Sequence, residues 1–459
     1  MTRDECEALA KKVLSFATAD ETRVTIGSSA SGNMRFAVNQ ASTSGDSYDT
    51  TVSVRSTFGK KSASSTINST DDASLRAVVQ RSEDLARLAP EDPEALPELG
   101  PQSYVESPAW SAATAAMAAG DRAAMVNAIT AIAKASNLVS TGFLEVNASV
   151  FAVANNKGLF GYTRQTAAAL TTTVRTPDGT GSGWAGASTN DATKIDAASL
   201  GRRAAEKARR SVSPVAIEPG RYTVVLEPTA VGNLVQLIAG ALGARQADEG
   251  RSFFSKPGGG NKIGMKVVDE RVTLVSDPMD PDTPGGTMSG DGFPLQKRVW
   301  IENGVVKTLA YDRYWAQRQG VQPNSGGFGG FGGGGGGGFG GGGGLKMMGD
   351  KHSLEDLIAS TERGILCTRF WYIRPVDQRT ILYTGLTRDG TFLIEKGKIT
   401  RPVKNMRWNE SPIFLLNNLE MLGRPERINA SESGSAGGAI VMPAVKARDF
   451  NFTSASDAV

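Results

Sequence analysis

The chain has 459 residues, of which 40% are hydrophobic and 21% are charged, and its formal net charge is +3. This length exceeds the roughly 250 to 300 residues at which one hydrophobic core stops growing, so we expect two or more domains. The balanced charge excludes a global polyelectrolyte, and charge alone identifies no partner. His352 is the only histidine, which excludes mechanisms that need several imidazoles.

The first residues and the cysteine content favour a cytoplasmic protein. Acidic residues interrupt the first basic ones, and the continuous apolar region of a secretory signal does not follow. No run of about 18 apolar residues occurs, so we expect no membrane span. Cys6 and Cys367 are the only cysteines, which fits a reducing compartment and excludes a disulfide framework.

Residues 1–89 predict a first helix-and-sheet subdomain. Apolar residues at three- and four-residue spacing from Cys6 to Leu14 indicate an amphipathic helix. A second helix is expected from Asp71 to Leu88, with acidic residues at the positive end of its dipole. Between the two helices lie three β-rich runs, at Thr22–Ile26, Met34–Asn39 and Thr50–Phe58.

Residues 109–213 predict a second helix-and-sheet subdomain. Five prolines between Ala89 and Pro108 remove backbone donors, so this segment is expected to be an extended crossover between the two subdomains. The expected elements of the second subdomain are a helix, two long strands and a helix, near Asp121–Ser136, Leu138–Asn155, Leu159–Thr176 and Asp191–Ser211.

Residues 220–459 predict a mostly-β domain, so the expected fold class is α+β. Short β-rich runs are separated by turn residues, and Asn303-Gly304 stands between two of them as the pair that best tolerates a tight hairpin turn. From Gly326 to Gly344 the chain contains only glycine apart from three phenylalanines. Such a segment cannot bury enough surface to offset its ordering entropy, so we expect a disordered loop. A permissive insertion is one interpretation of this loop, and sticky contacts of its phenylalanines with clients or subunits are the other.

Two stretches of the C-terminal half resemble the TldD/PmbA family of bacterial metalloproteases. In Gly349–Val403, a short acidic helix leads through a turn that ends in Gly-Ile to a hairpin that closes on Arg-Pro-Val. In Tyr222–Gly264, a β-strand and a helix precede Glu249-Gly250-Arg251-Ser252-Phe253-Phe254-Ser255. The N-terminal half matches the family only in its order of elements.

The resemblance implies a zinc site in the catalytic subunits of the family that this chain lacks. In those subunits the central helix carries His-Glu-x-x-x-His, and a cysteine near the C-terminus completes the site. Histidines about one turn apart can hold one zinc ion, and the glutamate can deprotonate the bound water. The corresponding positions here are Val235, Gln236 and Gly240, and residues 433–459 contain no cysteine. We therefore expect no catalytic residue, metal or cofactor in this chain.

The family also contains PmbA-type (TldE) subunits that lack the motif and pair with a TldD-type subunit. The resemblance implies that such a pair encloses a chamber in which the zinc-bearing partner cuts an unfolded or extended peptide. We expect this chain to be such a pseudoprotease subunit, which helps to hold the peptide by strand addition. The candidate strand contains Arg369, Phe370 and Trp371. A homodimer stays open, and neither nucleic acid nor a membrane is an expected partner.

Two other function classes stay open. An independent hydrolase would use Cys367 as a nucleophile, or a metal bound by carboxylates such as Asp248 and Glu249. A reactive thiolate normally needs a histidine or another cationic neighbour, and the missing imidazoles count against this class. A homodimeric peptide-binding module would need no protease partner at all.

Three further features admit two interpretations each. His352 is a surface or capping residue, or a ligand or base. The three acids of Asp277–Asp282 form a solvated proline-rich turn or bind a hard cation. One basic helix is a solvated face or docks a partner subunit, and nucleic acid is disfavoured because no aromatic residues interleave with the bases. The bases of that helix are Arg202, Arg203, Lys207, Arg209 and Arg210.

Overall fold

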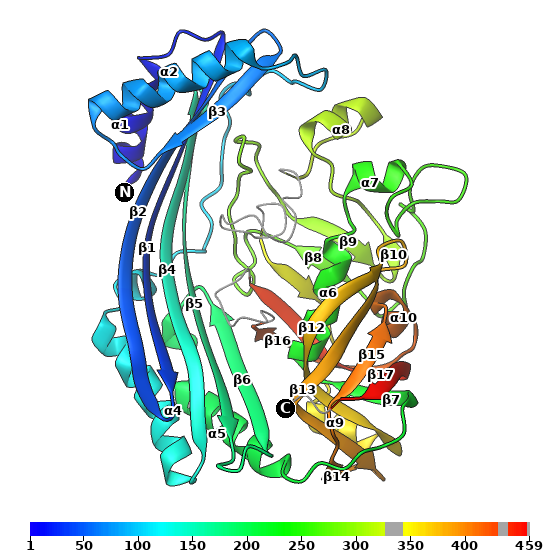
Figure 1. Ribbon diagram of the computed structural model, residues 1–459. Coiled ribbons are helices and arrows are strands. Elements are labelled where there is room, and N and C mark those ends of the chain that lie inside the picture. The colour runs from blue at the N-terminus through cyan, green and yellow to red at the C-terminus, as the bar shows by residue number, and fades with distance from the viewer. Residues whose placement is uncertain (326–342, 430–438, 457–459) are drawn as a thin grey trace.

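The α+β class that the sequence predicts is confirmed by a computed structural model, which describes residues 1–325, 343–429 and 439–456. An N-terminal sheet with helices on it precedes a region dominated by strands (Figure 1). The predicted glycine-rich loop lies outside the described residues except for Gly343 and Gly344. Within the described ranges, no helix is both long and apolar enough to cross a membrane.

The N-terminal sheet contains six strands in the order β3-β2-β1-β4-β5-β6. Their bounds are β1 (Glu21–Ala37), β2 (Gln40–Phe58), β3 (Lys61–Ile67), β4 (Val139–Asn155), β5 (Phe160–Arg175) and β6 (Ser182–Thr189). β1 pairs with β4 in antiparallel register from Arg23 to Phe36. The two helix-and-sheet units expected from the sequence therefore share one continuous sheet.

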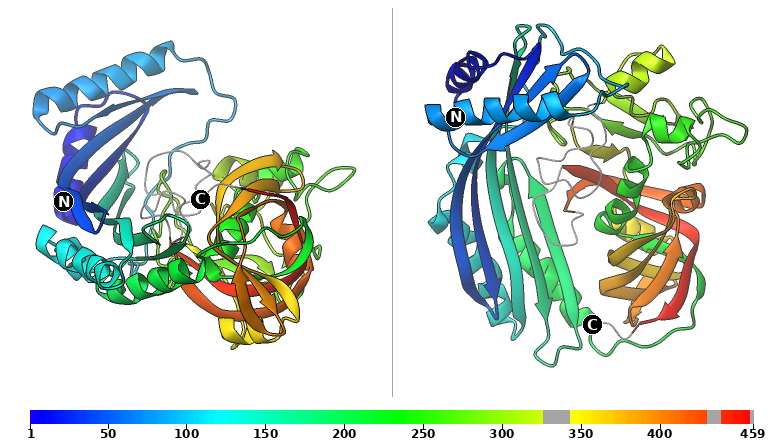
Figure 2. Two further views of the ribbon diagram at one scale, coloured as in Figure 1. Left: turned by 60° about the horizontal axis from the view of Figure 1, so that its bottom comes forward. Right: turned by 45° about the horizontal axis from the view of Figure 1, so that its top comes forward.

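The helices of this region pack on one face of the sheet. Their bounds are α1 (Arg3–Leu14), α2 (Asp72–Leu88), α3 (Ala112–Ala115), α4 (Ala119–Ala135), the 3₁₀ turn η1 (Ala192–Lys194) and α5 (Ala197–Arg210). Val24 and Ile26 of β1 lie in one core cluster with residues of α1 and α2, and Phe36 lies in another with residues of α4 and α5. Alternate residues of a strand point to the same face, so both helix pairs cover that face. Figure 2 shows the gap between them along the strands.

The helix expected from Asp191 begins six residues later, at Ala197. Asp191 instead caps η1 by accepting a hydrogen bond from the Thr193 backbone N–H, and Asp196 caps α5 by accepting one from Ser199. Both aspartates are good N-cap residues, so the sequence alone did not decide between them. Residues 89–108, where an extended crossover is expected, contain neither helix nor strand.

The C-terminal region is built on a closed set of strands. Five strands pair in the order β7, β12, β13, β15 and β17. β17 also pairs with β7, which closes the set. The strands are β7 (Gly220–Leu226), β8 (Leu274–Ser276), β9 (Arg298–Glu302), β10 (Val305–Val306), β11 (Leu345–Met347), β12 (Arg363–Asp377), β13 (Leu382–Glu395), β14 (Lys398–Pro402), β15 (Met406–Glu410), β16 (Leu419–Ile428) and β17 (Ile440–Ala455). The helices are α6 (Pro228–Ala239), α7 (Ala244–Asp248), α8 (Arg313–Gln319), α9 (Leu354–Ala359) and α10 (Pro412–Asn417).

The expected Asn-Gly hairpin is confirmed. Asn303 and Gly304 have φ values of 49° and 77° and connect β9 to β10. Lys396 and Gly397 make the equivalent turn between β13 and β14, with φ values of 52° and 73°. Two consecutive residues with positive φ twist the chain to suit a two-residue hairpin, which explains the glycine at the second position.

Glu410, at the end of β15, is a buried carboxyl group that makes stability depend on pH. Only 3% of the residue is exposed. Burial raises its pKa to about 7, from an ordinary value of 4.5, although the backbone N–H groups of Ser411 and Asn451 donate hydrogen bonds to its carboxylate. Between these two pH values the folded state binds more protons than the unfolded state, so this group makes stability fall as the pH rises.

We expect Glu410→Gln to remove this pH dependence. A shift of this size corresponds to a loss of roughly 3 kcal/mol between pH 4.5 and pH 7. Urea denaturation at pH 5 and pH 8 gives the free energy of unfolding of the wild-type protein and of the variant. The difference between the two proteins at each pH cancels the contributions of the other titrating groups. The two proteins should be similarly stable at pH 5, and the variant should be the more stable one at pH 8. Equal differences at both pH values would contradict this prediction.

Candidate functional site

Helix α6 carries the positions that correspond to the zinc motif of the family that the chain resembles. Val235 is fully buried in the main core cluster of the C-terminal region. Gln236 is half-buried, and Gly240 is exposed just beyond the end of the helix. Valine and glycine have no side-chain lone pair, and the neutral amide of Gln236 cannot act as a general base. These three positions therefore offer no zinc site.

Strand β12 runs beside α6 and contains the candidate peptide-binding residues. The backbone N–H of Phe370 donates a hydrogen bond of 3.0 Å to Oδ1 of Asn233 in α6. The Phe370 ring is 1% exposed, stacks on Phe450 and packs against Trp408. Phe370 is thus a core residue that joins the helix to the strand. Its side chain is closed to a peptide in this structure.

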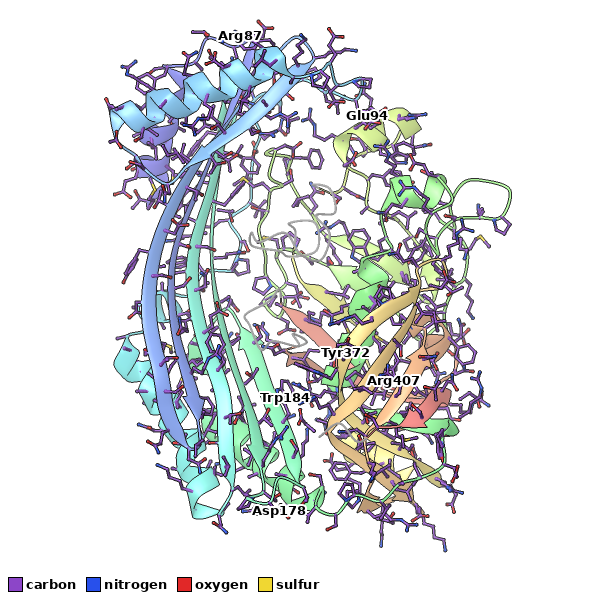
Figure 3. The ribbon with its side chains drawn as sticks, in the orientation of Figure 1. Arg87, Glu94, Asp178, Trp184, Tyr372 and Arg407 are labelled. Carbon is purple, nitrogen blue, oxygen red and sulfur yellow. The ribbon has the colours of Figure 1, made fainter. Side chains whose placement is uncertain are left out.

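Arg369 lies in a buried polar cluster between the N-terminal sheet and the C-terminal region. Its guanidinium is 3.2 Å from the carboxylate of Asp389 and lies over the rings of Trp184 and Trp371. Asp389 also accepts a hydrogen bond of 2.6 Å from Oγ of Ser182, the first residue of β6. Figure 3 shows Trp184 on the side of the sheet that faces the C-terminal region. This cluster holds the two parts of the chain together.

Cys367, the candidate nucleophile, is fully buried on β12. Burial raises the pKa of its thiol, and the nearby Glu227 carboxylate raises it further. The thiolate is the nucleophilic form of cysteine. Arg369, the nearest cation after Cys367 in the sequence, is paired with Asp389 instead. Cys367 therefore behaves as a small core residue and not as a nucleophile.

Lys207 of α5 and Glu227, which precedes α6, form a close ion pair across the interface. Lys207 Nζ lies 2.6 Å from Glu227 Oε2, and the two side chains are 15% and 8% exposed. Burial lowers the pKa of Lys207, while the Glu227 carboxylate opposes that shift. Thr368 donates a hydrogen bond of 3.4 Å to the other oxygen of Glu227. The pair ties the basic helix of the N-terminal region to the first turn of α6.

A family model decides where the chain belongs. The model of the PmbA/TldA metallopeptidase C-terminal domain matches residues 219–454, more than half of the chain, and the model of the central domain matches residues 106–212. The chain belongs to the TldD/PmbA family. The resemblance read from the sequence is therefore confirmed.

Two relatives within the TldD/PmbA family are named as metalloproteases. The chain is 26% identical over 250 residues to a metalloprotease of Methanothermobacter thermautotrophicus, a match that covers 53% of this chain and 51% of the relative. It is 28% identical over 229 residues to the metalloprotease TldD homolog of Haemophilus influenzae, with 50% and 46% covered. The matched stretch thus spans about half the length of these relatives.

Two solved structures of the same fold each cover 98% of the chain. TldE from Thermococcus kodakarensis has a TM-score of 0.82 at 18% identity, with 98% of this chain and 99% of that chain covered. A protein of Thermotoga maritima described as a putative modulator of a DNA gyrase has the same TM-score at 17% identity, with 98% and 100% covered. These similarities show that this TldD/PmbA family member has the same fold as the two solved structures.

The carboxylates considered as ligands of an alternative metal already have protein partners. Asp248 accepts hydrogen bonds of 2.7 Å from both Trp315 Nε1 and Asn261 Nδ2. Glu249 pairs with Arg245 and Arg251. Over residues 1–325, 343–429 and 439–456, no group of three or more His, Cys, Asp and Glu side chains could hold a metal ion.

Two of the other sequence candidates also have structural partners in this TldD/PmbA member. Lys346 Nζ lies 2.9 Å from the carboxylates of both Asp280 and Asp282, where a hard cation was considered. One ammonium group therefore already pairs with both carboxylates. His352 lies 3.5 Å from Asp350, next to the capped start of α9. It matches the surface interpretation better than the ligand interpretation.

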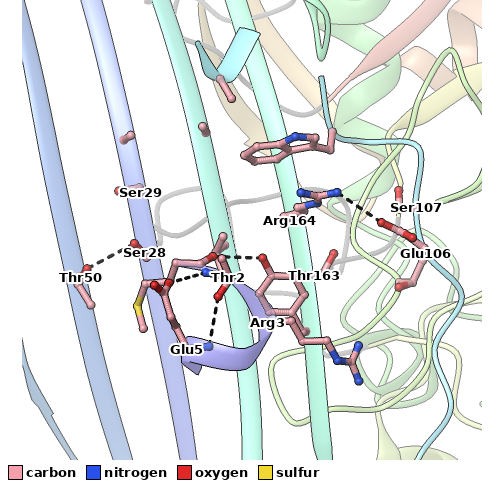
Figure 4. A pocket seen from close by; sticks show the side chains of 18 of the residues that line it. Thr2, Arg3, Glu5, Ser28, Ser29, Thr50, Glu106, Ser107, Thr163 and Arg164 are labelled. Carbon is pink, nitrogen blue, oxygen red and sulfur yellow. Dashed lines mark hydrogen bonds and ion pairs between the residues drawn. The ribbon is translucent and has the colours of Figure 1, made fainter. Parts of the chain in front are cut away.

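A cavity lies elsewhere, on the N-terminal sheet between the two helix pairs. It measures about 900 Å³. Figure 4 shows the first turn of α1 beside its floor and the ion pair of Arg164 with Glu106 at its wall. Arg164 also lies over the ring of Trp110, 4.9 Å from its centre. None of the site residues predicted from the sequence lines this cavity.

The sequence left Lys207 on a basic helix that is either a solvated face or a docking surface for a partner subunit, and it did not indicate Glu227. One signal was available for the lysine. Leu200 and Ala204 are buried on α5, and Lys207 follows at the i+7 position of the same stripe. A base at that spacing faces the core side of the helix and needs a buried partner. The acid that meets it could not be found, because it is contributed by a distant segment.

Proposed function

We propose that this chain is a non-catalytic subunit of a TldD/TldE-type protease complex. It would bind unfolded or extended peptides while a zinc-bearing TldD-type partner hydrolyses them. The observation that carries the proposal is the chemistry of α6, where Val235, Gln236 and Gly240 provide neither ligands nor a base. In the partner, the zinc ion would lower the pKa of a bound water and polarise the scissile carbonyl.

The outer half of β12 supports a role in peptide binding. β7 pairs with β12 only from Ile365 to Cys367. Beyond Trp371 the strand becomes exposed, and the side chains of Tyr372 and Val376 are 50% and 55% exposed. Main-chain pairing with an extended peptide tolerates many sequences, and these two side chains would add apolar contacts. Arg369 and Phe370 would then hold the strand in place through their buried contacts, without touching the peptide.

An independent hydrolase is the weaker candidate. Its thiol would have to act from a fully buried site in which the pKa of Cys367 is raised. Its metal would have to displace the partners of Asp248 and Glu249. A homodimeric module that binds peptide without cleavage needs no such changes, and it differs from the first proposal only in its partner.

We expect the purified chain to contain no stoichiometric zinc and to cleave no unfolded peptide by itself. Activity should appear when a TldD-type protein that carries His-Glu-x-x-x-His is added, and a chelator should abolish it. Elemental analysis and a peptidase assay with unfolded casein, with and without that protein, measure both properties. A control with the two motif histidines of the added protein changed to alanine should be inactive.

Two results would contradict the proposal. If the isolated chain cleaved peptides in a zinc-dependent way, it would be a catalytic subunit itself. The homodimeric module would be favoured by a chain that binds peptide but neither co-purifies with the TldD-type protein nor changes the activity of that protein.

A further inference from the structure

Three arginines lie on the outer face of strands β12, β13 and β15. In an antiparallel pair, directly opposed residues point to the same side of the sheet, and so do alternate residues of one strand. Arg388 of β13 lies opposite Arg369, and Leu386, two residues earlier, lies opposite Arg407 of β15. Arg374 of β12 lies opposite the next outward position of β13. Arg374, Arg388 and Arg407 therefore share one face, which we call the arginine face.

The arginine face is turned away from the core of the barrel and toward the N-terminal sheet. Phe370 and Trp408, whose side chains point to the opposite side of the same strands, are buried in the main core cluster. Arg369 points to the same side as the arginine face and lies over the ring of Trp184 in β6. Figure 3 shows Arg407 on the C-terminal strands and Trp184 on the strand of the N-terminal sheet that is nearest to them.

Aromatic rings orient two of these arginines. The guanidinium of Arg388 lies 4.9 Å from the centre of the Trp371 ring, and that of Arg374 lies 4.4 Å from the centre of the Tyr372 ring. An arginine that stacks through its flat side keeps the N–H groups at its edge for a carboxylate. Arg374 is exposed and the Arg388 side chain is 24% exposed, so solvent reaches both groups. Because both side chains are already ordered, binding costs them little conformational entropy.

The arginine face carries an excess of positive charge. In the described part of the chain, Asp389 is the carboxylate that forms ion pairs beside it, at 3.2 Å from Nε of Arg369 and 3.8 Å from Nε of Arg388. Arg369 is buried, so its charge and that of Asp389 offset each other inside the interface. Arg407 donates a hydrogen bond of 3.3 Å to the neutral hydroxyl of Thr384. Clustered charges of one sign raise the local concentration of ligands of the opposite sign.

We propose that the arginine face binds the acidic side chains of extended peptides. Each carboxylate would accept hydrogen bonds from the guanidinium edges of Arg374, Arg388 or Arg407. The face adjoins Tyr372, one of the exposed side chains on the outer half of β12. The inference rests on the peptide-binding role proposed above and deepens it, because it names acidic segments as the preferred substrate class.

Single-stranded nucleic acid is the other class of polyanion that arginines bind. Its bases stack on aromatic rings. The ring of Trp371 already lies against the guanidinium groups of Arg388 and Arg369, whose carbon atoms are 4.9 and 5.3 Å from its centre. The ring of Tyr372 lies against Arg374. These contacts occupy ring faces that a base would need, so the structure favours a peptide.

A pair of peptides tests the proposal on the purified chain. One is a fluorescein-labelled glycine–serine peptide with glutamate at alternate positions, and the other carries glutamine there, which keeps the size and removes the charge. Fluorescence anisotropy measures the dissociation constant of each peptide. We expect the glutamate peptide to bind about tenfold more tightly, which corresponds to about one charge-assisted hydrogen bond. The difference should shrink at high salt concentration, because ions screen exposed charges.

Substitutions locate the effect on the chain. Arg388→Gln and Arg407→Gln each remove one charge and keep a polar side chain, and each should reduce the preference for the glutamate peptide several-fold. Arg209→Gln is the matched control, because Arg209 is exposed on α5, outside the arginine face, and it should leave the preference unchanged. The comparison of the two peptides on the wild-type chain needs no variant, so it decides the question even if a variant is unstable.

Three results would overturn the proposal. They are equal dissociation constants for the two peptides at low salt, an equal loss of preference in Arg209→Gln, and displacement of the glutamate peptide by a single-stranded oligonucleotide at a lower concentration than by the unlabelled peptide. The third result would assign the face to nucleic acid. Failure of the proposed function would look different: a TldD-type partner would cleave neither peptide, whereas the preference of the isolated chain would still test the arginine face.

Discussion

Lys207→Ala is expected to destabilise the protein by about 3 to 5 kcal/mol, because it leaves the Glu227 carboxylate buried without its cation. Lys207 and Glu227 are separated by 2.6 Å and are mostly shielded from water. The lost lysine also removes a contact with the Trp184 carbonyl. The midpoint of urea denaturation, followed by tryptophan fluorescence, measures the change.

The matched control for this variant is Arg209→Ala on the same helix. Arg209 is exposed, and surface substitutions of this kind usually stay within about 0.5 kcal/mol. A double variant, Lys207→Met with Glu227→Leu, removes both charges and should recover much of the loss, since apolar replacements of buried ion pairs are often neutral. If Lys207→Ala costs no more than Arg209→Ala, the ion pair does not stabilise the interface as we expect.

Gly183→Ala is expected to cost about 3 kcal/mol, at the upper end of the usual effect of overpacking. Gly183 lies on β6 directly beneath α5. A Cβ atom at this position would lie 2.2 Å from the carbonyl oxygen of Ala204 and 2.5 Å from the backbone nitrogen of Ala208. Neither backbone atom can rotate away, so α5 would have to move off the sheet together with Lys207.

Gly45→Ala provides the control in the same sheet. The nearest atom to a Cβ at Gly45 is Nδ2 of Asn33, at 3.8 Å, which is an ordinary van der Waals contact. We expect its melting temperature to stay close to that of the wild-type protein, whereas Gly183→Ala should melt several degrees lower. Equal melting temperatures for the two variants would show that α5 can adjust without loss of stability.

The sequence predicts the helices of this fold better than the extent of its strands. Asp71–Leu88 was expected and Asp72–Leu88 is observed, because caps and the 3.6-residue period are local signals. The runs Thr22–Ile26 and Met34–Asn39 were expected as separate strands, but β1 continues through Gly27–Gly32. Glycine and serine have low strand propensity, and pairing with β2 and β4 on both sides overrides it.

The candidate site was predictable only where local chemistry decides it. The missing zinc donors of α6 follow from residue identity alone, and the burial of Cys367 follows from its apolar surroundings in the sequence. The roles of Arg369 and Lys207 could not be predicted, because their partners Asp389 and Glu227 come from other segments. Ion pairs between separate segments depend on tertiary structure, which single-residue patterns do not contain.

The closure of the C-terminal strands by β17 has a consequence for biosynthesis. β17 pairs with β7, β11, β15 and β16, and it is the last of these strands to leave the ribosome. Until then β7 lacks one of its two neighbours, although its sequence was translated about 200 residues earlier. Pairing over such a sequence separation folds slowly because the loop entropy must be overcome first. The nascent chain therefore keeps one side of β7 unpaired until β17 has been translated.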